Sequence, residues 1–167
     1  MLSLQELSDR IEIQELIIRY SNAIDRRDFD RLDSVFTPDA YIDYRALGGI
    51  DGQYPVIKDW LGPVLASFPH YFHLIGNIEI TLSGDTATAR TLCLNPMDTP
   101  LPGGDSQVMF LGLWYRDKLV RTREGDSEIF SRFLTTSMLP KLAHLWEQRR
   151  LLPGKARVKP ARIRTCV

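Results

Sequence analysis

Hydrophobic residues recur at helical spacing over the first 25 residues of the chain, and charged residues stand between them. The apolar positions that share this spacing are Leu4, Leu7, Ile11, Ile17, Ile18 and Ile24. Ser3 and Glu6 have the spacing of a capping box, which satisfies backbone donors at a helix start. The pattern predicts a helix that begins after Ser3 and ends at about Asp25. Asp28 then has the position of an N-cap for a short second helix over residues 29–36.

The stretch from residue 40 to residue 69 predicts a hairpin followed by a third helix. Residues 40–44 are strand-like, and a glycine-rich turn follows them at residues 48–52. Pro55 opens the third helix, and Pro69 lies just beyond its end. Gly62 and Pro63 are predicted to break this helix.

From Phe72 onward the apolar positions alternate with the period of a β-strand. The alternation predicts strands over residues 72–82, 86–95, 107–121 and 128–136. Residues 96–106 contain three prolines and two glycines and are predicted to form a flexible loop. A closing helix is expected over residues 140–150. Helices first and a meander of antiparallel strands after them indicate the α+β class, with helices on one side of the sheet.

The chain has 167 residues, which fits one domain, expected over residues 1–148. Its formal net charge is zero, but residues 149–167 hold seven basic residues and no acidic one. Residues 1–148 therefore carry 14 basic and 21 acidic residues, a net charge of −7. Such an acidic body is a poor nucleic-acid binder, so no nucleic-acid partner is expected. The basic arm contains Pro153, Gly154 and Pro160, which predict a mostly extended segment.

Several function classes find no support in the motifs. The two cysteines, Cys93 and Cys166, suggest no disulfide framework, and the three histidines lack metal-ligand spacing. There is neither a glycine-rich phosphate loop nor a Gly-x-Ser-x-Gly elbow. We therefore expect no metal and no cofactor. The absence of a long apolar run and of a signal-peptide pattern predicts a cytoplasmic protein that does not enter the membrane.

Asp25 is the first residue whose type conflicts with its position. It lies close to the apolar stripe of the first helix, where a carboxylate is costly unless it has a partner. The alternative is that Asp25 lies past the helix end and only caps or turns the chain, together with Arg26 and Arg27.

His73 is the second such residue, at the start of the strand over residues 72–82. Strand parity places Phe72 on one face and His73 on the other, so His73 faces solvent if only the first face is core. A bulge at Gly76 would re-aim the histidine, and so would a strand end that is buried on both faces. His70 lies in a predicted loop and is a competitor, whereas His144 is expected to be an exposed helical residue.

An aspartate and a histidine together suit proton transfer. A neutral imidazole accepts a proton near neutral pH, and a carboxylate on its other nitrogen sets the tautomer and stabilises the imidazolium. Such a pair contains no nucleophile, so it fits proton abstraction next to a carbonyl, followed by elimination or isomerisation. Candidate donors to the developing oxyanion are Tyr20, Tyr41, Tyr44, Tyr71 and Arg132. An ordinary aromatic core would account for the tyrosines equally well.

Several segments resemble the SnoaL-like proteins of the nuclear transport factor two-like superfamily. The first three are residues 13–20 (IQELIIRY), 23–28 (AIDRRD) and 36–40 (FTPDA), and the middle hairpin supplies 73–77 (HLIGN) and 83–89 (SGDTATA). Relatives in this superfamily include scytalone dehydratase, a hexachlorocyclohexane dehydrochlorinase, ketosteroid isomerase and the polyketide cyclases. The resemblance covers about residues 4–134 and is more specific for the fold than for the reaction.

The resemblance implies a cone in which a bent antiparallel sheet wraps around a pocket closed by helices. In the dehydratase and dehydrochlorinase branch, an aspartate that ends the first helix orients a histidine on a strand, and Asp25 and His73 match these positions. The sequence departs from the family over residues 125–132 (GDSEIFSR), where the tryptophan of a Gly-Trp-Arg-Ile-like strand is missing and Arg132 is retained. The C-terminal lid of the pocket and the choice of substrate therefore stay open.

The sequence and the resemblance together predict a cofactor-independent lyase or isomerase of dehydratase type. His73 would take a proton, Asp25 would orient it, and Tyr20, Tyr44 or Arg132 would stabilise the negative charge. The expected substrate is an apolar, ring-containing small molecule. The residues predicted to contact it are Phe36, Tyr41, Trp60, Phe68, Met97, Phe110 and Trp114.

Other functions remain open at this point. The same cone could serve as a non-catalytic module for small-molecule binding or protein assembly, and an epoxide hydrolase or a polyketide cyclase-like enzyme is a weaker alternative. Because sheets of this fold usually pack against a second copy, the resemblance also implies a homodimer or a higher homo-oligomer.

Overall fold

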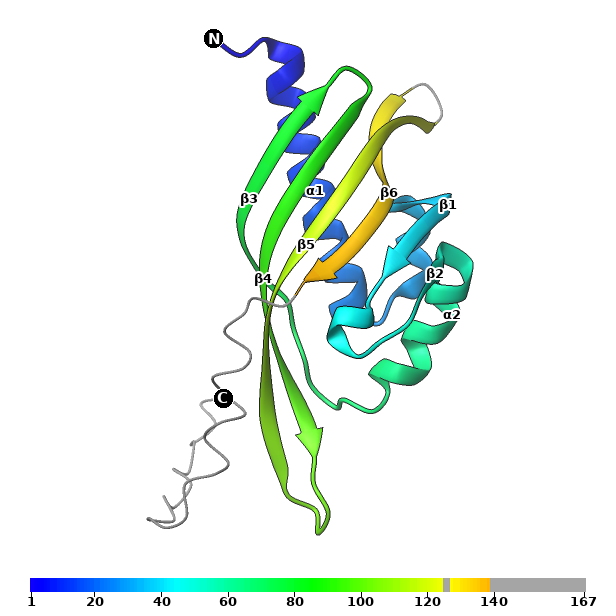
Figure 1. The fold of residues 1–167 in the computed structure, drawn as a ribbon, viewed down its shortest axis with the longest axis vertical. Coiled ribbons are helices and arrows are strands. Elements are labelled where there is room, and N and C mark those ends of the chain that lie inside the picture. Colours follow the sequence, from blue (N-terminus) through cyan, green and yellow to red (C-terminus); the bar gives the residue numbers. More distant parts are fainter. Residues whose placement is uncertain (125–126, 139–167) are drawn as a thin grey trace.

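The computed structural model describes residues 1–124 and 127–138, which form two α-helices, two 3-10 helices and six strands (Figure 1). In chain order these elements are α1 (Leu4–Asp25), η1 (Phe29–Ser34), β1 (Phe36–Asp43), η2 (Arg45–Leu47), β2 (Asp51–Gln53), α2 (Tyr54–Leu65), β3 (Leu74–Ser83), β4 (Thr86–Pro100), β5 (Ser106–Glu124) and β6 (Ser127–Met138). The closing helix predicted over residues 140–150 and the basic arm over residues 149–167 lie outside the described residues.

The described strands form one bent, unclosed sheet in the order β2-β1-β6-β5-β4-β3. Every pairing is antiparallel except that of β1 with β6, which is parallel. The helix α1 crosses the sheet and contacts β3 and β6, whereas α2 packs beside β1 (Figure 1). This is the predicted α+β cone, with the N-terminal helices on one side of a bent sheet.

The capping box at the start of α1 is present as predicted. The Ser3 main-chain N–H donates to Glu6 Oε2 at 2.7 Å, and the Glu6 N–H donates to Ser3 Oγ at 3.1 Å. The buried stripe of α1 comprises Ile13, Leu16, Ile17, Tyr20, Ala23 and Ile24. Four of the residues predicted to share the stripe are instead exposed: Leu4, Leu7, Ile11 and Ile18. At 100° per residue these four side chains fall on the side of α1 opposite the buried stripe, so they point away from the sheet.

A bulge in β3 decides which way His73 faces. Ile75 pairs with Cys93 on β4, and the next pair is Ile78 with Thr91, so β3 contains one residue more than β4 between these pairs. The extra residue lies at Gly76 or Asn77, and such an insertion shifts the alternation of faces by one. His73 and Ile75 therefore face inward together with the apolar residues beyond the bulge. Of the two ways in which the sequence could turn His73 inward, the structure shows the bulge, at or next to Gly76.

The predicted flexible loop over residues 96–106 is wrong, because β4 and β5 stay paired across most of it. The ladder runs on through Pro96 opposite Phe110 to Pro100 opposite Ser106. Beyond Leu94, which pairs with Leu74, β4 has no described strand on that side and meets only the segment before β3, through a bridge of Met97 with Tyr71 and a hydrogen bond from the Asp98 N–H to the His70 carbonyl. A proline, which lacks an N–H, is tolerated where a strand has a continuous partner on one side alone. The paired strands project well beyond the body of the molecule (Figure 1).

The predicted break at Gly62 and Pro63 is also absent, because α2 continues through Pro63 to Leu65. Pro63 lies in the last turn of α2. Its missing N–H removes one backbone hydrogen bond, at a helix end where several carbonyl groups already have no partner within the helix. The second helix is the 3-10 helix η1 and ends before Phe36, which begins β1. Asp28 precedes it, but its side chain caps nothing.

No helix in residues 1–124 and 127–138 combines the length and the apolar character that crossing a membrane requires.

Candidate active site

A cavity of about 260 Å³ lies between α1, α2, the η2 turn and the inner face of β4 and β5. Most of its wall is apolar and includes Trp60, Leu65, Phe68, Met97, Leu111 and Leu113. Its polar side chains are Tyr20, Tyr44, His73, Asn95 and Tyr115. The described part of this wall therefore combines a large apolar surface with a few polar groups, as small-molecule sites do.

Asp25 and His73 form a two-point contact at this wall. The His73 main-chain N–H donates to Asp25 Oδ2 at 3.0 Å, and His73 Nδ1 lies 2.6 Å from Asp25 Oδ1. An ionised carboxylate only accepts hydrogen bonds, so the neutral imidazole carries its proton on Nδ1 and leaves Nε2 as a base. The His73 side chain is 8% exposed and that of Asp25 is 24% exposed, so the pair is sheltered but not sealed.

The end of α1 is tied to the segment that carries His73. Arg27 adopts a left-handed conformation with φ of 57° just past the helix, which turns the chain after Asp25. Its guanidinium then donates to the Phe68 carbonyl at 2.8 Å. The Tyr71 hydroxyl donates to the Ile24 carbonyl at 3.0 Å. These tethers hold the aspartate and the histidine together although 48 residues separate them.

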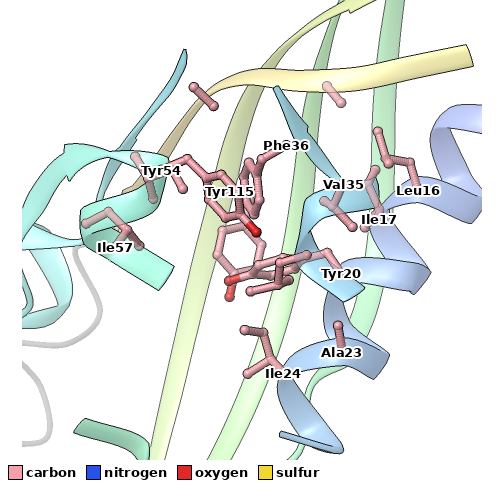
Figure 2. Close-up of a cluster of buried hydrophobic side chains, with 14 of the residues drawn as sticks. Leu16, Ile17, Tyr20, Ala23, Ile24, Val35, Phe36, Tyr54, Ile57 and Tyr115 are labelled. Atoms are coloured by element: carbon pink, nitrogen blue, oxygen red, sulfur yellow. The ribbon is translucent and has the colours of Figure 1, made fainter. Parts of the chain in front are cut away.

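Two tyrosines that were predicted as oxyanion donors also meet at the cavity. The hydroxyls of Tyr20 and Tyr44 lie 2.8 Å apart and share a hydrogen bond. The Tyr20 ring stands edge-on to the His73 ring at a centroid distance of 6.2 Å, and to the Tyr115 ring at 5.6 Å. Figure 2 shows Tyr20 reaching from α1 toward Tyr115 on the sheet. The hydroxyl pair therefore belongs to the same pocket as the imidazole.

The loop between Tyr44 and Trp60 approaches the pocket closely. A Cβ atom on Gly49 would stand 2.8 Å from the Trp60 ring and 3.0 Å from Tyr44 Cβ, closer than packed carbon atoms allow. Tyr44 and Trp60 stack with their rings 6.2 Å apart, so this glycine lets the loop lie against both.

Two further polar residues that line the pocket were missed by sequence reasoning, Asn95 and Tyr115, and the fully buried Cys93 lies two residues before Asn95 on β4. Cys93 and Asn95 alternate with Met97 on one face of β4, and this buried face within an apolar strand was the available signal. Burial raises the pKa of the Cys93 thiol to about 12, with a smaller contribution from the Asp25 charge and a partial offset from a hydrogen bond with Tyr115. Cys93 is therefore a protonated, inert residue of the core.

The residues predicted to contact substrate divide into two groups. Trp60, Phe68 and Met97 line the cavity. Phe36 does not line it but is buried behind the wall, where its ring stacks on Tyr54 at 5.1 Å. Tyr41 does not line it either, because its hydroxyl donates to Asp51 on the neighbouring strand β2.

Phe110 and Trp114 do not line the pocket, contrary to the prediction, because strand parity places them on the other face of the sheet. Leu111, Leu113 and Tyr115 face the cavity from β5, so the residues between them face the other side of the sheet. Phe110 is 64% exposed there. The ring of Trp114 carries the Arg90 guanidinium 3.8 Å from its centroid.

Arg132 lies on β6, where its backbone is in register with Phe36 and with Leu119, and its side chain is outside the described part of the structure. No group of three or more histidine, cysteine, aspartate or glutamate side chains with the arrangement of a metal site occurs among the described residues. The chemistry of the described site is thus that of one imidazole–carboxylate pair with hydroxyl and amide groups around it.

The comparisons with known proteins agree on the fold. The model of the SnoaL-like domain matches residues 5–126. The uncharacterized protein Rv2910c of Mycobacterium tuberculosis is 60% identical over 125 residues, covering 75% of this chain and 84% of that protein.

Two solved structures have a similar fold at low identity. The Kfla4162 protein from Kribbella flavida has a TM-score of 0.70 at 23% identity, covering 84% of this chain and 97% of that chain. The hexachlorocyclohexane dehydrochlorinase type3 from Novosphingobium barchaimii has a TM-score of 0.68 at 20% identity, covering 81% and 89%. The family model spans most of the chain, including Asp25 and His73, and the chain therefore belongs to the SnoaL-like family.

Proposed function

We propose that this protein is a cofactor-independent lyase or isomerase that removes a proton next to a carbonyl group of a neutral, ring-containing molecule. The observation that carries the proposal is the two-point contact of Asp25 with His73 at the wall of an apolar cavity. A non-catalytic binding module would require no such pair. The 2.6 Å contact and the low exposure of the imidazole favour acid–base chemistry.

The proposed step begins with His73 Nε2 as the base. The C–H bond next to the carbonyl breaks, its proton moves to Nε2, and its electron pair moves onto the carbonyl oxygen to form an enolate. Asp25 stabilises the imidazolium that results. In an elimination the electron pair then returns to expel a leaving group from the neighbouring carbon, and in an isomerisation the imidazolium returns the proton to a different carbon.

The enolate oxygen needs hydrogen-bond donors within the same pocket. The Tyr20–Tyr44 hydroxyl pair is our candidate, because it lines the cavity together with His73 and sits among apolar side chains, where a hydrogen bond to a developing charge is strong. Arg132, predicted from the sequence for the same task, remains a second candidate.

The described wall also limits the substrate. It contains no aspartate, glutamate, lysine or arginine side chain, so no fixed positive charge in it matches a carboxylate or a phosphate. Its volume of about 260 Å³ lies just below the range of about 300–1,000 Å³ typical of drug-sized ligands. We therefore propose a neutral substrate of one or two rings.

Proton abstraction can be tested without knowing the complete reaction. A panel of one- and two-ring ketones, such as cyclohexenones and tetralones, is incubated with the protein in D₂O, and deuterium uptake next to the carbonyl is followed by NMR. We expect uptake above the buffer rate for at least one ketone and its loss in His73→Ala. His70→Ala is the matched control, because His70 is exposed and lies outside the cavity wall. Equal uptake by the native protein and His73→Ala, or none above buffer across the panel, would refute the proposal.

A further inference from the structure

Asn95 is a buried amide on the cavity-facing side of β4. It is 2% exposed and lies between Cys93 and Met97 on that face, opposite Leu111 of β5. An amide in such apolar surroundings is costly unless its polar atoms are hydrogen-bonded. The partners of this side chain therefore indicate what it is for.

The nitrogen of the Asn95 side chain has a partner in the protein. Nδ2 donates to the Phe72 carbonyl at 3.1 Å, and a carbonyl accepts only from the NH₂ end of an amide. This bond sets the orientation of the amide and leaves Oδ1 as its second polar atom. Oδ1 has no hydrogen-bond partner among the described residues, and the side chain lines the cavity.

The same bond links Asn95 to the proposed base. Phe72 immediately precedes His73, whose own N–H is held by Asp25. The amide is therefore anchored to the segment that carries the imidazole, and a group bound by Oδ1 would share the pocket with His73.

We propose that Asn95 is a specificity-determining residue whose Oδ1 accepts a hydrogen bond from a hydroxyl or N–H group of the molecule in the cavity. This inference rests on the proposed function only in taking the bound molecule to be a substrate. It adds that the substrate carries a hydrogen-bond donor on its ring besides the carbonyl group. A ligand without the donor leaves Oδ1 desolvated and unpaired, and a site selects strongly against such a ligand.

The test measures binding and requires no turnover. Phenols of one and two rings, such as 4-ethylphenol and 2-naphthol, are titrated beside their methyl ethers, which keep the ring and lose the donor. Dissociation constants come from protein NMR. The native protein is expected to prefer at least one phenol over its ether about three- to tenfold, the effect of one net hydrogen bond. In Asn95→Leu, which is close in volume, the preference should disappear because phenol binding weakens while ether binding does not.

Leu94→Ala is the matched control, since Leu94 precedes Asn95 on β4 but is 40% exposed on the other face of the sheet and does not line the cavity. It should keep the preference. If Asn95→Leu does not fold, Asn95→Ala replaces it, because water can then reach the Phe72 carbonyl, and the same loss is expected.

The proposal is overturned if no phenol of the panel binds the native protein more tightly than its ether, or if the preference survives in the Asn95 variant. It is also overturned if His73→Ala abolishes the preference and Asn95→Leu keeps it, because the hydroxyl then binds the imidazole. Loss of deuterium exchange with an intact phenol preference would reject the proposed reaction and leave the role of Asn95 standing.

Discussion

One carboxylate, that of Asp25, accepts both the main-chain N–H and the imidazole Nδ1 of His73. The first bond places the backbone at the entrance to β3, and the second sets the tautomer of the ring. Position and protonation of the proposed base therefore depend on the last residue of α1.

Asp25→Asn should show whether the charge of Asp25, and not only its shape, is needed to position and protonate His73. The amide keeps the shape of the carboxylate but cannot accept two hydrogen bonds as an anion, so the preferred tautomer and the stabilised imidazolium are both lost. We expect kcat for deuterium exchange to fall by about 10²–10⁴-fold with little change in KM. Asp28→Asn, three residues further and exposed, is the control. Retention of native kcat by Asp25→Asn would argue against the pair as the catalytic unit.

Cys93 should resist thiol reagents while the protein is folded. Its raised pKa, about 12, keeps the thiol protonated from neutral pH to well above pH 9, and the reactive form is the thiolate. In a Cys166→Ser background, labelling by a disulfide reagent at pH 8 should be negligible in buffer and rapid in denaturant. Comparable rates in the two conditions would show that the core around Cys93 opens readily.

The ion pair between Asp9 and Arg121 should be the main electrostatic tie between the N-terminal half of α1 and the sheet. Arg121 Nη2 lies 2.9 Å from Asp9 Oδ2, and the two side chains are 11% and 6% exposed. Asp9→Ala leaves a buried guanidinium whose other carboxylate, Asp85, is 86% exposed. We expect a loss of about 3 kcal/mol in the free energy of unfolding, measured with urea.

Asp85→Asn is the companion variant, because an exposed partner contributes about 0–1 kcal/mol. If Asp9→Ala and Asp85→Asn lower the free energy of unfolding equally, burial does not determine how much the Asp9–Arg121 pair stabilises the fold.

The hydrogen bond from Tyr54 to Asp33 should make part of the stability depend on pH. The Tyr54 hydroxyl donates to Asp33 Oδ1 at 2.7 Å, and this bond, followed by that from Lys58, lowers the pKa of Asp33. A lowered pKa stabilises the folded state above the unfolded-state value of about 3.9, and the contribution fades as pH falls through the folded-state value.

Tyr54→Phe should therefore cost about 1 kcal/mol at pH 7, the lower end for a charged acceptor because Asp33 is 61% exposed. The difference between the native protein and the variant should shrink below about pH 4. Urea unfolding at several pH values measures it, and a constant difference down to pH 2 would assign the loss to packing alone.

Much of the fold follows from local patterns. The helical spacing and the capping box of Ser3 and Glu6 predict α1 because caps and amphipathicity act within a few residues. The loop predicted over residues 96–106 failed for the opposite reason. Prolines disfavour a central strand, and only the structure shows that the β3–β4 ladder ends at Leu74 and Leu94, so that beyond it β4, among the described strands, pairs continuously with β5 alone.

The candidate site was predictable only in part. Residue types and their resemblance to a family single out Asp25 and His73. The placement of Phe110 and Trp114 failed because alternation says which residues share a face and not which face is inside. That choice depends on where the sheet bends and on what packs against it.

The sequence by itself determined most of the elements, the alternation of faces along each strand and the residue types available for acid–base chemistry, because these depend on neighbours a few positions apart. The tertiary structure alone decided that the bulge between Ile75 and Ile78 turns His73 inward, that Asp25 meets it at 2.6 Å, and that Asn95 reaches the same cavity. Register, sheet curvature and long-range tethers set these relationships, and none of them is encoded within a single stretch of the chain.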